Sequence, residues 1–253
     1  MFSRTTRNKE FDAPFNSLQR RARLLFVNAK YNGIANTIMF FVKQISKRLG
    51  LYSGPVEKLG QGSSSSGLDV SGIVAVSDLS IPDAKRHSAN HYEHTSELEF
   101  RHVLDSLKLS LSQYQFLDFG SGKGAVLAAA AGYPFKGVTG VEFCPNLHAV
   151  AVRNAGLIKK VKAQFISPLL QDATEYIPPA EPHVFFFYNP FKPDIMKYVL
   201  ENCRVAVRDS AQRSYIMYKN PVHGRFFEDQ PGINRISEPF GGSWAVYTFD
   251  AVS

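Results

Sequence analysis

One stretch of the chain combines glycines and acidic residues at a spacing that suits a ligand. Over 116–124, FLDFGSGKG, an apolar run is followed by an acid and then by glycines at every second position. These residues are Asp118, Gly120, Gly122 and Gly124. Because glycine lacks a Cβ, such a turn can adopt positive φ values and let a ligand approach the backbone. A second apolar run ends at Glu142, whose carboxylate could accept hydrogen bonds from both hydroxyls of a ribose. The stretch therefore predicts a nucleoside-binding site.

The residues around this turn predict one strand–helix–strand unit of a doubly wound α/β sheet. Residues 125–131 are Ala-rich and predict a helix, and 137–141 predict a second strand that stops at Glu142. Free N–H groups at the start of the helix would favour an anionic group on the ligand. Such a unit would hold the glycines and the acid at the edge of the sheet where ligands bind.

The spacing of the glycines excludes two common nucleotide sites. A dinucleotide fingerprint, G-x-G-x-x-G, would need a glycine at the position of Ala125. A Walker loop would need a glycine at the position of Leu117 and a Ser or Thr in place of Gly124. The observed pattern is D-x-G-x-G-x-G, followed one strand–helix unit later by Glu142. It resembles motif I and the ribose-binding acid of the Rossmann-like class I S-adenosylmethionine (SAM) methyltransferases.

This resemblance implies a fold, a cofactor and a set of contacts. The fold would be α/β, a doubly wound sheet of seven mostly parallel strands with the last strand antiparallel and helices on both faces. SAM would be the cofactor, with the glycine turn at its methionine end and Glu142 at its ribose. The residues assigned to the turn site are Asp118, Gly120, Ser121, Gly122 and Gly124. Lys123 would either face the carboxylate of SAM or point outward.

The resemblance also implies cofactor contacts from two other segments. Asp172 would accept the exocyclic amine of adenine, and the small Ala173 would let the ring approach. Tyr92 and Thr95 match a Tyr-x-x-Thr segment that folds over SAM in methyltransferases of this shape. An ordinary surface-loop acid and ordinary loop packing are the alternatives for these two segments.

A second informative stretch ends another apolar run. Residues 183–188, HVFFFY, predict a strand buried on both faces, with Asn189, Pro190 and Phe191 at its carboxyl end. The tripeptide resembles motif IV of amino-methylating enzymes, (Asp/Asn)-Pro-Pro-(Tyr/Phe). There the Asn oxygen and the next carbonyl accept hydrogen bonds from the target NH₂, and the aromatic packs on the flat target. The resemblance implies Asn189, Pro190 and Tyr188 as catalytic residues. Because the motif here has one proline, a turn that only lines the cofactor pocket stays open.

The remaining patterns predict the elements around these stretches. Ser96-x-x-Glu99 is a capping box and predicts the start of a helix, and Pro145 suits the first turn of another. Further elements are expected where apolar residues recur at strand or helix spacing. They are a helix at 194–204 and strands at 163–166, 214–218, 232–237 and 244–249, of which the last two would pair antiparallel.

Composition narrows the class of protein. At 253 residues and 44% hydrophobic content, the chain fits one domain with an appendage. Two cysteines without a C-x-x-C pattern favour a reducing compartment, which we take to be the cytoplasm. Three histidines are spaced H-x₃-H-x₂-H but lack a neighbouring cysteine and an H-E-x-x-H pattern, so no metal site is predicted. They are His87, His91 and His94.

Positive charge is concentrated at the N-terminus. Residues 1–51 carry ten Lys/Arg and two acids, a net +8, whereas 52–253 carry nineteen Lys/Arg and twenty acids, a net −1. Because phosphate binding needs Lys and Arg, nucleic acid is disfavoured as a substrate of the second part. We assign 1–51 to a basic amphipathic segment, 52–75 to a Gly/Ser-rich linker and 76–253 to a SAM-dependent methyltransferase domain.

Residues 31–51 predict an amphipathic helix with one apolar face. That face is formed by Ile34, Ile38, Phe41, Val42, Ile45 and Leu49. The longest apolar run, 38–42, is far shorter than the about 18 residues that a membrane span needs. Three interpretations stay open: contact with an anionic membrane surface or a partner, packing on the protein's own core, and a mitochondrial presequence.

Together these motifs predict a SAM-dependent methyltransferase that transfers a methyl group to an amine nitrogen of a protein lysine or a small molecule. Methyl transfer from a sulfonium is a direct displacement with a good leaving group. Positioning and desolvation of the nucleophile can therefore catalyse it without a catalytic triad. One alternative is a non-catalytic scaffold of the same fold, tethered through its N-terminal helix. The other is a nucleotide-dependent oxidoreductase, which NAD binding would indicate.

Overall fold

The structure is a computed structural model that describes residues 22, 25–53, 67–70, 95–208, 210 and 212–251. The chain divides into two compact units, Met1–Gly60 and Gln61–Ser253. The border falls inside the segment 52–75, and the assignment of that whole segment to a linker stays a prediction.

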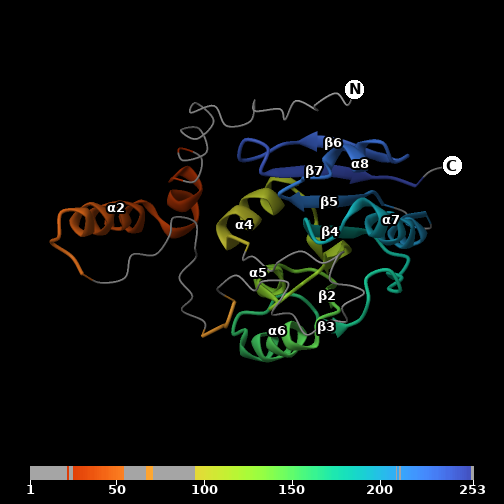
Figure 1. The fold of residues 1–253 in the computed structure, drawn as a ribbon, viewed down its shortest axis with the longest axis horizontal. Helices are drawn as coiled ribbons and strands as arrows, with labels where there is room; N and C mark the ends of the chain where they lie inside the picture. The colour runs from red at the N-terminus through yellow and green to blue at the C-terminus, as the bar shows by residue number, and fades with distance from the viewer. Residues whose placement is uncertain are drawn as a thin grey trace, which may run out of the picture. The chain divides into compact units, whose positions relative to one another are not determined.

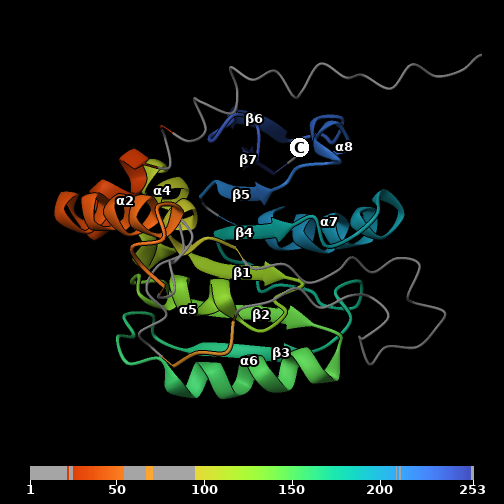
Figure 2. The ribbon, with the colours of Figure 1, turned by 60° about the vertical axis from the view of Figure 1, so that its left-hand side comes forward.

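The larger unit is built on one seven-stranded sheet with the order β3-β2-β1-β4-β5-β7-β6. β1 to β5 are parallel, and β7 pairs antiparallel with both β5 and β6. Figure 2 shows the strands stacked in this order. They are β1 Gln115–Phe119, β2 Gly137–Glu142, β3 Ile166–Leu170, β4 His183–Tyr188, β5 Ser214–Lys219, β6 Ile233–Ser237 and β7 Trp244–Phe249. The predicted α/β class, strand number and antiparallel last strand are confirmed.

Helices cover both faces of this sheet (Figures 1 and 2). On one face α4 packs on α5 and α5 on α6, while α7 and α8 lie on the other. They are α4 Glu97–Ser106, α5 Ala125–Ala131, α6 Pro145–Leu157, α7 Pro193–Arg208 and α8 Gly224–Glu228, with a short 3₁₀ turn η2 at Leu111–Gln113. α4 begins where predicted because the Oγ of Ser96 accepts the N–H of Glu99 at 3.3 Å.

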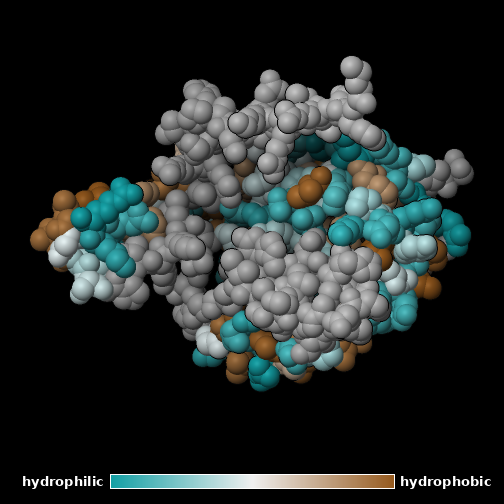
Figure 3. All heavy atoms as spheres, in the orientation of Figure 1, coloured by the Kyte–Doolittle hydropathy of each residue, from teal (hydrophilic) through white to brown (hydrophobic). Residues whose placement is uncertain are grey.

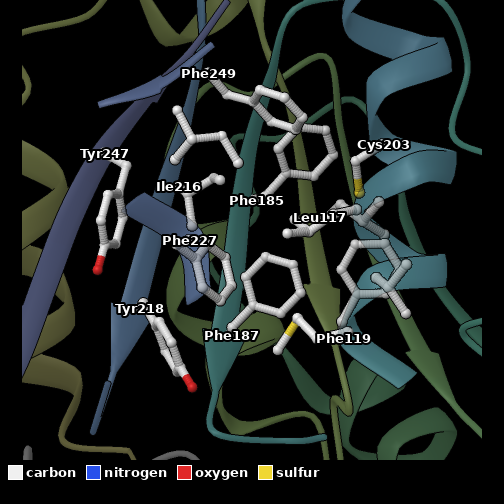
Figure 4. Close-up of a cluster of buried hydrophobic side chains, with 14 of the residues drawn as sticks. Leu117, Phe119, Phe185, Phe187, Cys203, Ile216, Tyr218, Phe227, Tyr247 and Phe249 are labelled. Carbon is white, nitrogen blue, oxygen red and sulfur yellow. The ribbon is translucent and has the colours of Figure 1, made fainter. Parts of the chain in front are cut away.

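Strand alternation divides the aromatic side chains of β4 between the two faces. Phe185 and Phe187 pack toward α7, in the cluster drawn in Figure 4. Phe186 points the other way, with its ring centre 6.0 Å from that of Phe100 of α4. Burying each such ring contributes about 1.5–3 kcal/mol. A strand buried on both faces therefore anchors the centre of the sheet and fixes where its carboxyl end lies.

Three elements of the larger unit differ from the prediction. β3 spans Ile166–Leu170 instead of 163–166, and its side chains are only partly buried. It is an edge strand and contains Pro168, which an edge tolerates because one side of its backbone has no neighbour in the sheet. Partial burial leaves little apolar pattern to read there. α7 spans Pro193–Arg208 instead of 194–204, and the short α8 was not predicted.

The smaller unit contains α2, Ile34–Arg48, preceded by a helix over 25–32. Gly33, at φ 84°, separates the two helices. The predicted amphipathic helix is therefore present, over a narrower range than 31–51. Within the part of the chain that the structure describes, no helix is long and apolar enough to cross a membrane.

Candidate functional site

The glycine turn after β1 adopts the conformation that its sequence predicts. Gly120, Gly122 and Gly124 have φ values of 78°, 54° and 78°, which other residues seldom adopt. The turn also satisfies its own backbone. The N–H groups of Gly120 and Ser121 donate to the carbonyl oxygen of Val141 at 2.9 and 3.2 Å, and that of Gly124 donates to the carbonyl of Ser121 at 2.8 Å. These N–H groups are not available to an anionic ligand, contrary to what glycine turns at helix starts suggest.

Glu142 ties the glycine turn to the end of β2. Its Oε2 accepts the N–H of Gly122 at 2.9 Å, and its Oε1 accepts the N–H of Cys144 at 2.8 Å. The two carboxylate oxygens have about four acceptor positions, and the backbone N–H of Phe143 also acts on the group, so not all of these positions are used. The geometry therefore holds the carboxylate rigidly and leaves acceptor capacity for the predicted ribose contact.

Asp118 and Glu142 form a desolvated pair of acids beside the turn. Asp118 is 2% exposed, and burial, with a smaller contribution from the charge of Glu142, raises its pKa well above the ordinary value. Burial also raises the pKa of Glu142, against the opposing effect of the backbone N–H groups that bind it. Two carboxyl groups held in this way favour a ligand that brings hydrogen-bond donors or positive charge.

Ser121 adds a hydroxyl without a partner to the same turn. Its Oγ is buried and has no hydrogen-bond partner in the described part of the chain. A Cβ on Gly140 of β2 would lie 2.8 Å from this oxygen, so the absence of a side chain there makes room for Ser121. A buried hydroxyl left unpaired is costly, and a bound ligand would remove that cost.

The tip of β4 touches the glycine turn. A Cβ placed on Gly120 would lie 2.9 Å from the Cβ of Pro190, closer than carbon atoms pack. Asn189 has φ 41°, which asparagine tolerates better than most residues. The hydroxyl of Tyr218, on β5, donates to Oδ1 of Asn189 at 3.2 Å. The structure thus brings Asn189 and Pro190 to the predicted cofactor turn.

The aromatic residue of the tripeptide does not lie at this edge. Phe191 is buried in the core on the α7 side, so it cannot pack on a flat target as the aromatic of motif IV does. Tyr188, the last residue of β4, is partly buried and lies on the opposite face of that strand from Phe187. The chain therefore departs from motif IV in structure as well as in sequence, because Phe191, the aromatic residue of the tripeptide, is buried in the core.

Comparisons with known proteins give no family, only distant similarity to solved structures. No protein-family model and no curated protein matches the chain. Magnesium protoporphyrin IX methyltransferase from Synechocystis PCC 6803, solved with SAM, is 12% identical over 60% of this chain and 77% of that one, with a TM-score of 0.43. An rRNA methylase from Streptococcus thermophilus is 15% identical over 60% and 95%, with a TM-score of 0.42. A 16S rRNA methyltransferase from T. thermophilus, in complex with AdoMet and guanosine, is 17% identical over 64% and 44%, with a TM-score of 0.45.

The strand order decides the architecture, because β7 inserts antiparallel between β5 and β6 in an otherwise parallel sheet. The chain has the class I methyltransferase fold. The fold therefore follows from the strand order, and cofactor and acceptor have to be argued from the side chains.

Within the class I methyltransferase fold, the other predicted cofactor residues are placed as follows. Oδ1 of Asp172 accepts the N–H and the hydroxyl of Thr174 at 2.9 and 2.7 Å, which closes a local turn after β3. Ala173 is buried in the core on the α7 side. Thr95 is buried directly before α4. Tyr92 and the histidines at 87, 91 and 94 lie outside the described residues.

Lys123 is engaged by residues that sequence reasoning did not connect to it. Its ammonium pairs with Asp69 at 3.0 Å. Asn154 of α6 is buried, accepts the N–H of Asp69 at 3.0 Å and donates to the carbonyl oxygens of Asp69 and Lys123 at 3.0 and 2.8 Å. Residues 67–70 are therefore held beside the glycine turn, although they belong to the segment assigned to a linker.

A buried charge cluster next to the β4 tip was also missed. Lys219, the last residue of β5, pairs with Glu99 of α4, and Nε1 of Trp244 donates to the same Glu99 oxygen at 3.0 Å. The Lys219 ammonium lies 5.1 Å from the centre of the Trp244 ring. Lys219 is directly opposite Tyr188 in the sheet. The sequence pattern identified Glu99 only as part of a capping box. A signal for the charge cluster was Lys219 itself, a lysine at the end of a largely apolar strand.

Proposed function

We propose that this protein is a SAM-dependent methyltransferase. The observation that supports this most is the pair of buried acids, Asp118 and Glu142, beside a positive-φ glycine turn at the carboxyl edge of the sheet. SAM carries an ammonium, a sulfonium and two ribose hydroxyls, which are the cationic and donor groups that such acids favour. Glu142 would hold the ribose, and the turn with Asp118 and Ser121 would hold the methionine end.

The same geometry disfavours the oxidoreductase alternative. A dinucleotide places its pyrophosphate on free backbone N–H groups at a glycine turn. Here the N–H groups of Gly120, Ser121, Gly122 and Gly124 all donate to protein oxygens. A pyrophosphate at this turn would also meet the buried carboxyl groups of Asp118 and Glu142, which offer it no positive charge. Both effects favour a cationic ligand over an anionic one.

We propose that the acceptor is an amine nitrogen. When bound, SAM supplies an electrophilic methyl group. The chain's own part is to position a neutral amine in line with it and to exclude water. Oδ1 of Asn189 and the carbonyl oxygen of Pro190 would accept the hydrogen bonds of that amine. The contact between Gly120 and Pro190 keeps these acceptors beside the cofactor turn.

Calorimetric titration tests the cofactor. We expect saturable binding of SAM and none of NAD. In Gly120→Ala the added Cβ meets Pro190 and the residue must keep φ 78°, so we expect SAM affinity to fall by more than about tenfold. Gly156→Ala is the matched control, because a Cβ there meets nothing within 4 Å, and it should bind SAM like the wild type. A folded protein that binds NAD and not SAM would refute the proposal.

Transfer of a labelled methyl group tests the acceptor. The protein is incubated with methyl-labelled SAM and, separately, with lysine-containing peptides and a panel of small amines. N-methyl products survive mild base, whereas carboxyl methyl esters are hydrolysed. We expect base-stable product, and a loss of about 10²-fold or more in rate for Asn189→Ala with SAM affinity kept. A base-labile product would refute the amine while leaving the methyltransferase proposal in place.

A further inference from the structure

The helix α2 leaves its apolar face uncovered. Five of the six residues predicted to form this face are between 50 and 69% exposed: Ile34, Ile38, Val42, Ile45 and Leu49. Met39 beside them is 54% exposed. Figure 3 shows hydrophobic and hydrophilic residues gathered on separate sides of this helix. A contiguous apolar stripe left in water marks a contact surface, because burying it would lower the free energy.

A different side of α2 holds it within its own unit. Thr37 is the buried residue of this helix, and its hydroxyl accepts a hydrogen bond from Nδ2 of Asn28 at 3.2 Å. Val27, next to Asn28, is also buried. The contact between the helix over 25–32 and α2 therefore uses a polar position outside the apolar face, which stays available to another surface.

Charge indicates what kind of surface that is. Residues 25–53 contain no Asp or Glu, and their four basic residues are Lys30, Lys43, Lys47 and Arg48. Lys43 and Lys47 lie on the side of the helix away from the apolar face, and Lys47 and Arg48 occupy its last turn. Over 1–51 the net charge is +8, against −1 for the rest of the chain. Long basic side chains can reach a charged surface while the apolar face is buried beneath it.

We propose that α2 lies flat on an anionic lipid bilayer, with its apolar face among the acyl chains and its lysines at the headgroups. This goes beyond the proposed function, since it does not involve the SAM site. A helix of 15 residues is about 22 Å long, less than the about 30 Å of a bilayer core, so it would lie in the interface and not cross it. A second copy is disfavoured as the occupant, because two segments of +8 would repel each other.

Co-sedimentation of the full-length protein with lipid vesicles tests this. The vesicles are phosphatidylcholine alone, or phosphatidylcholine mixed with phosphatidylglycerol. We expect partitioning at least about tenfold stronger onto the anionic vesicles, weakened by added salt. Ile38→Ser with Ile45→Ser should lower this partitioning by about tenfold or more, because two apolar side chains no longer enter the acyl region.

The matched control is Val152→Ser with Leu157→Ser, two exposed apolar residues of α6 in the larger unit, which should partition like the wild type. Lys43→Gln with Lys47→Gln leaves the apolar face intact and should also weaken anionic binding, so the charge argument is tested even if the serine variants lose helix by circular dichroism. Equal partitioning onto both kinds of vesicle, or none onto either, would overturn the proposal. So would a dimer in light scattering that dissociates in the serine variant.

Discussion

Asn189 is held in place by residues of two other segments, Tyr218 of β5 directly and Gly120 of the glycine turn through Pro190. Its backbone has φ 41°, which is uncommon even though asparagine tolerates it better than most residues. The Tyr218 hydroxyl, 3.2 Å from Oδ1, fixes the orientation of the amide, and Pro190 rests against Gly120. Burial raises the pKa of Tyr218 to about 12, so the hydroxyl keeps its proton and can donate over the physiological range. Tyr218 is thus a positioning residue for the acceptor site.

Replacing Tyr218 by phenylalanine removes this donor and little volume. Without it Oδ1 of Asn189 loses the hydrogen bond from Tyr218 that helps to orient it, so we expect kcat for methyl transfer to fall about tenfold while the Kd for SAM stays unchanged. Tyr215→Phe, on the same strand with its side chain on the opposite face, is the control and should change neither. A parallel loss of SAM affinity and thermal stability would mean that Tyr218 only supports the core.

At this scale the glycine turn and its acids could be predicted because their geometry is local. Positive φ needs glycine, and the end of an apolar run marks a strand tip. Tyr218 could not be connected to Asn189 in this way, since 29 positions separate them and a tyrosine in a strand is ordinary. The same holds for Asn154 and Asp69, which are 85 positions apart and meet only after α6 has packed on the sheet.

At the scale of elements, the cluster of Glu99, Lys219 and Trp244 joins α4 to the ends of β5 and β7. Glu99 and Lys219 are both buried, and the carboxylate receives the ammonium and the indole N–H on one oxygen. A buried pair is stable only while both partners are present, because an isolated buried charge keeps its full desolvation penalty. The cluster therefore fixes α4, which follows directly on Thr95, against the edge that carries Asn189.

Removing one partner of this pair should be far more costly than removing both. We expect Lys219→Met to lower the free energy of unfolding by about 3–5 kcal/mol, and Glu99→Leu with Lys219→Met to recover most of that loss. Urea unfolding followed by far-UV circular dichroism measures both. The control is Arg213→Met, which breaks a mostly exposed pair with Asp250 and should cost no more than about 1 kcal/mol. Equal costs for the single and double variants would contradict this account.

The edge of the sheet shows why element bounds were predicted unevenly. β2 and β7 were predicted to within a residue, because apolar residues stand out where a strand is buried. β3 was misplaced by several residues, because an edge strand buries little and Pro168 reads as a strand breaker. Burial, more than propensity, decides how easily a strand is recognised in a sequence.

At the scale of the whole molecule, the topology could be predicted because one turn and one strand end identify the sheet to which they belong. A glycine turn leading into a helix, an acid one unit later and a buried strand ending in Asn189-Pro190 are compatible with few arrangements. What the pattern did not predict is the chemistry that depends on distant contacts, including the packing of Phe191 into the core and the docking of 67–70 beside the turn.

The stability of the whole molecule should depend on pH through His183, at the start of the central strand. The side chain is buried, its ring lies flat on Phe185 with centres 4.8 Å apart, and Nδ1 is 2.6 Å from the carbonyl oxygen of Glu181. Burial lowers its pKa from 6.5 to about 4, so the folded protein keeps the ring neutral where the unfolded chain is protonated. Between these two values the unfolded state binds more protons, and stability is lost as the pH falls from 6.5 towards 4.

This predicts a pH slope that one substitution removes. At about 1.4 kcal/mol per pKa unit, His183 should account for about 3 kcal/mol of the stability lost over that interval. Gln at position 183 can still donate to the carbonyl oxygen of Glu181 but does not titrate, so His183→Gln should flatten the curve. The stability difference between wild type and variant should therefore shrink by about 3 kcal/mol as the pH falls from 6.5 to about 4. Asp118 and Glu142 act in the opposite sense, because their raised pKa values mean that protonation stabilises the folded state as the pH falls. The wild type and the variant share these two acids, so the difference between their stabilities isolates the contribution of the histidine. Urea unfolding at each pH, followed by fluorescence of the single tryptophan Trp244, measures both stabilities. If that difference stayed constant from pH 7 to pH 4, the acid sensitivity would have to come from other groups.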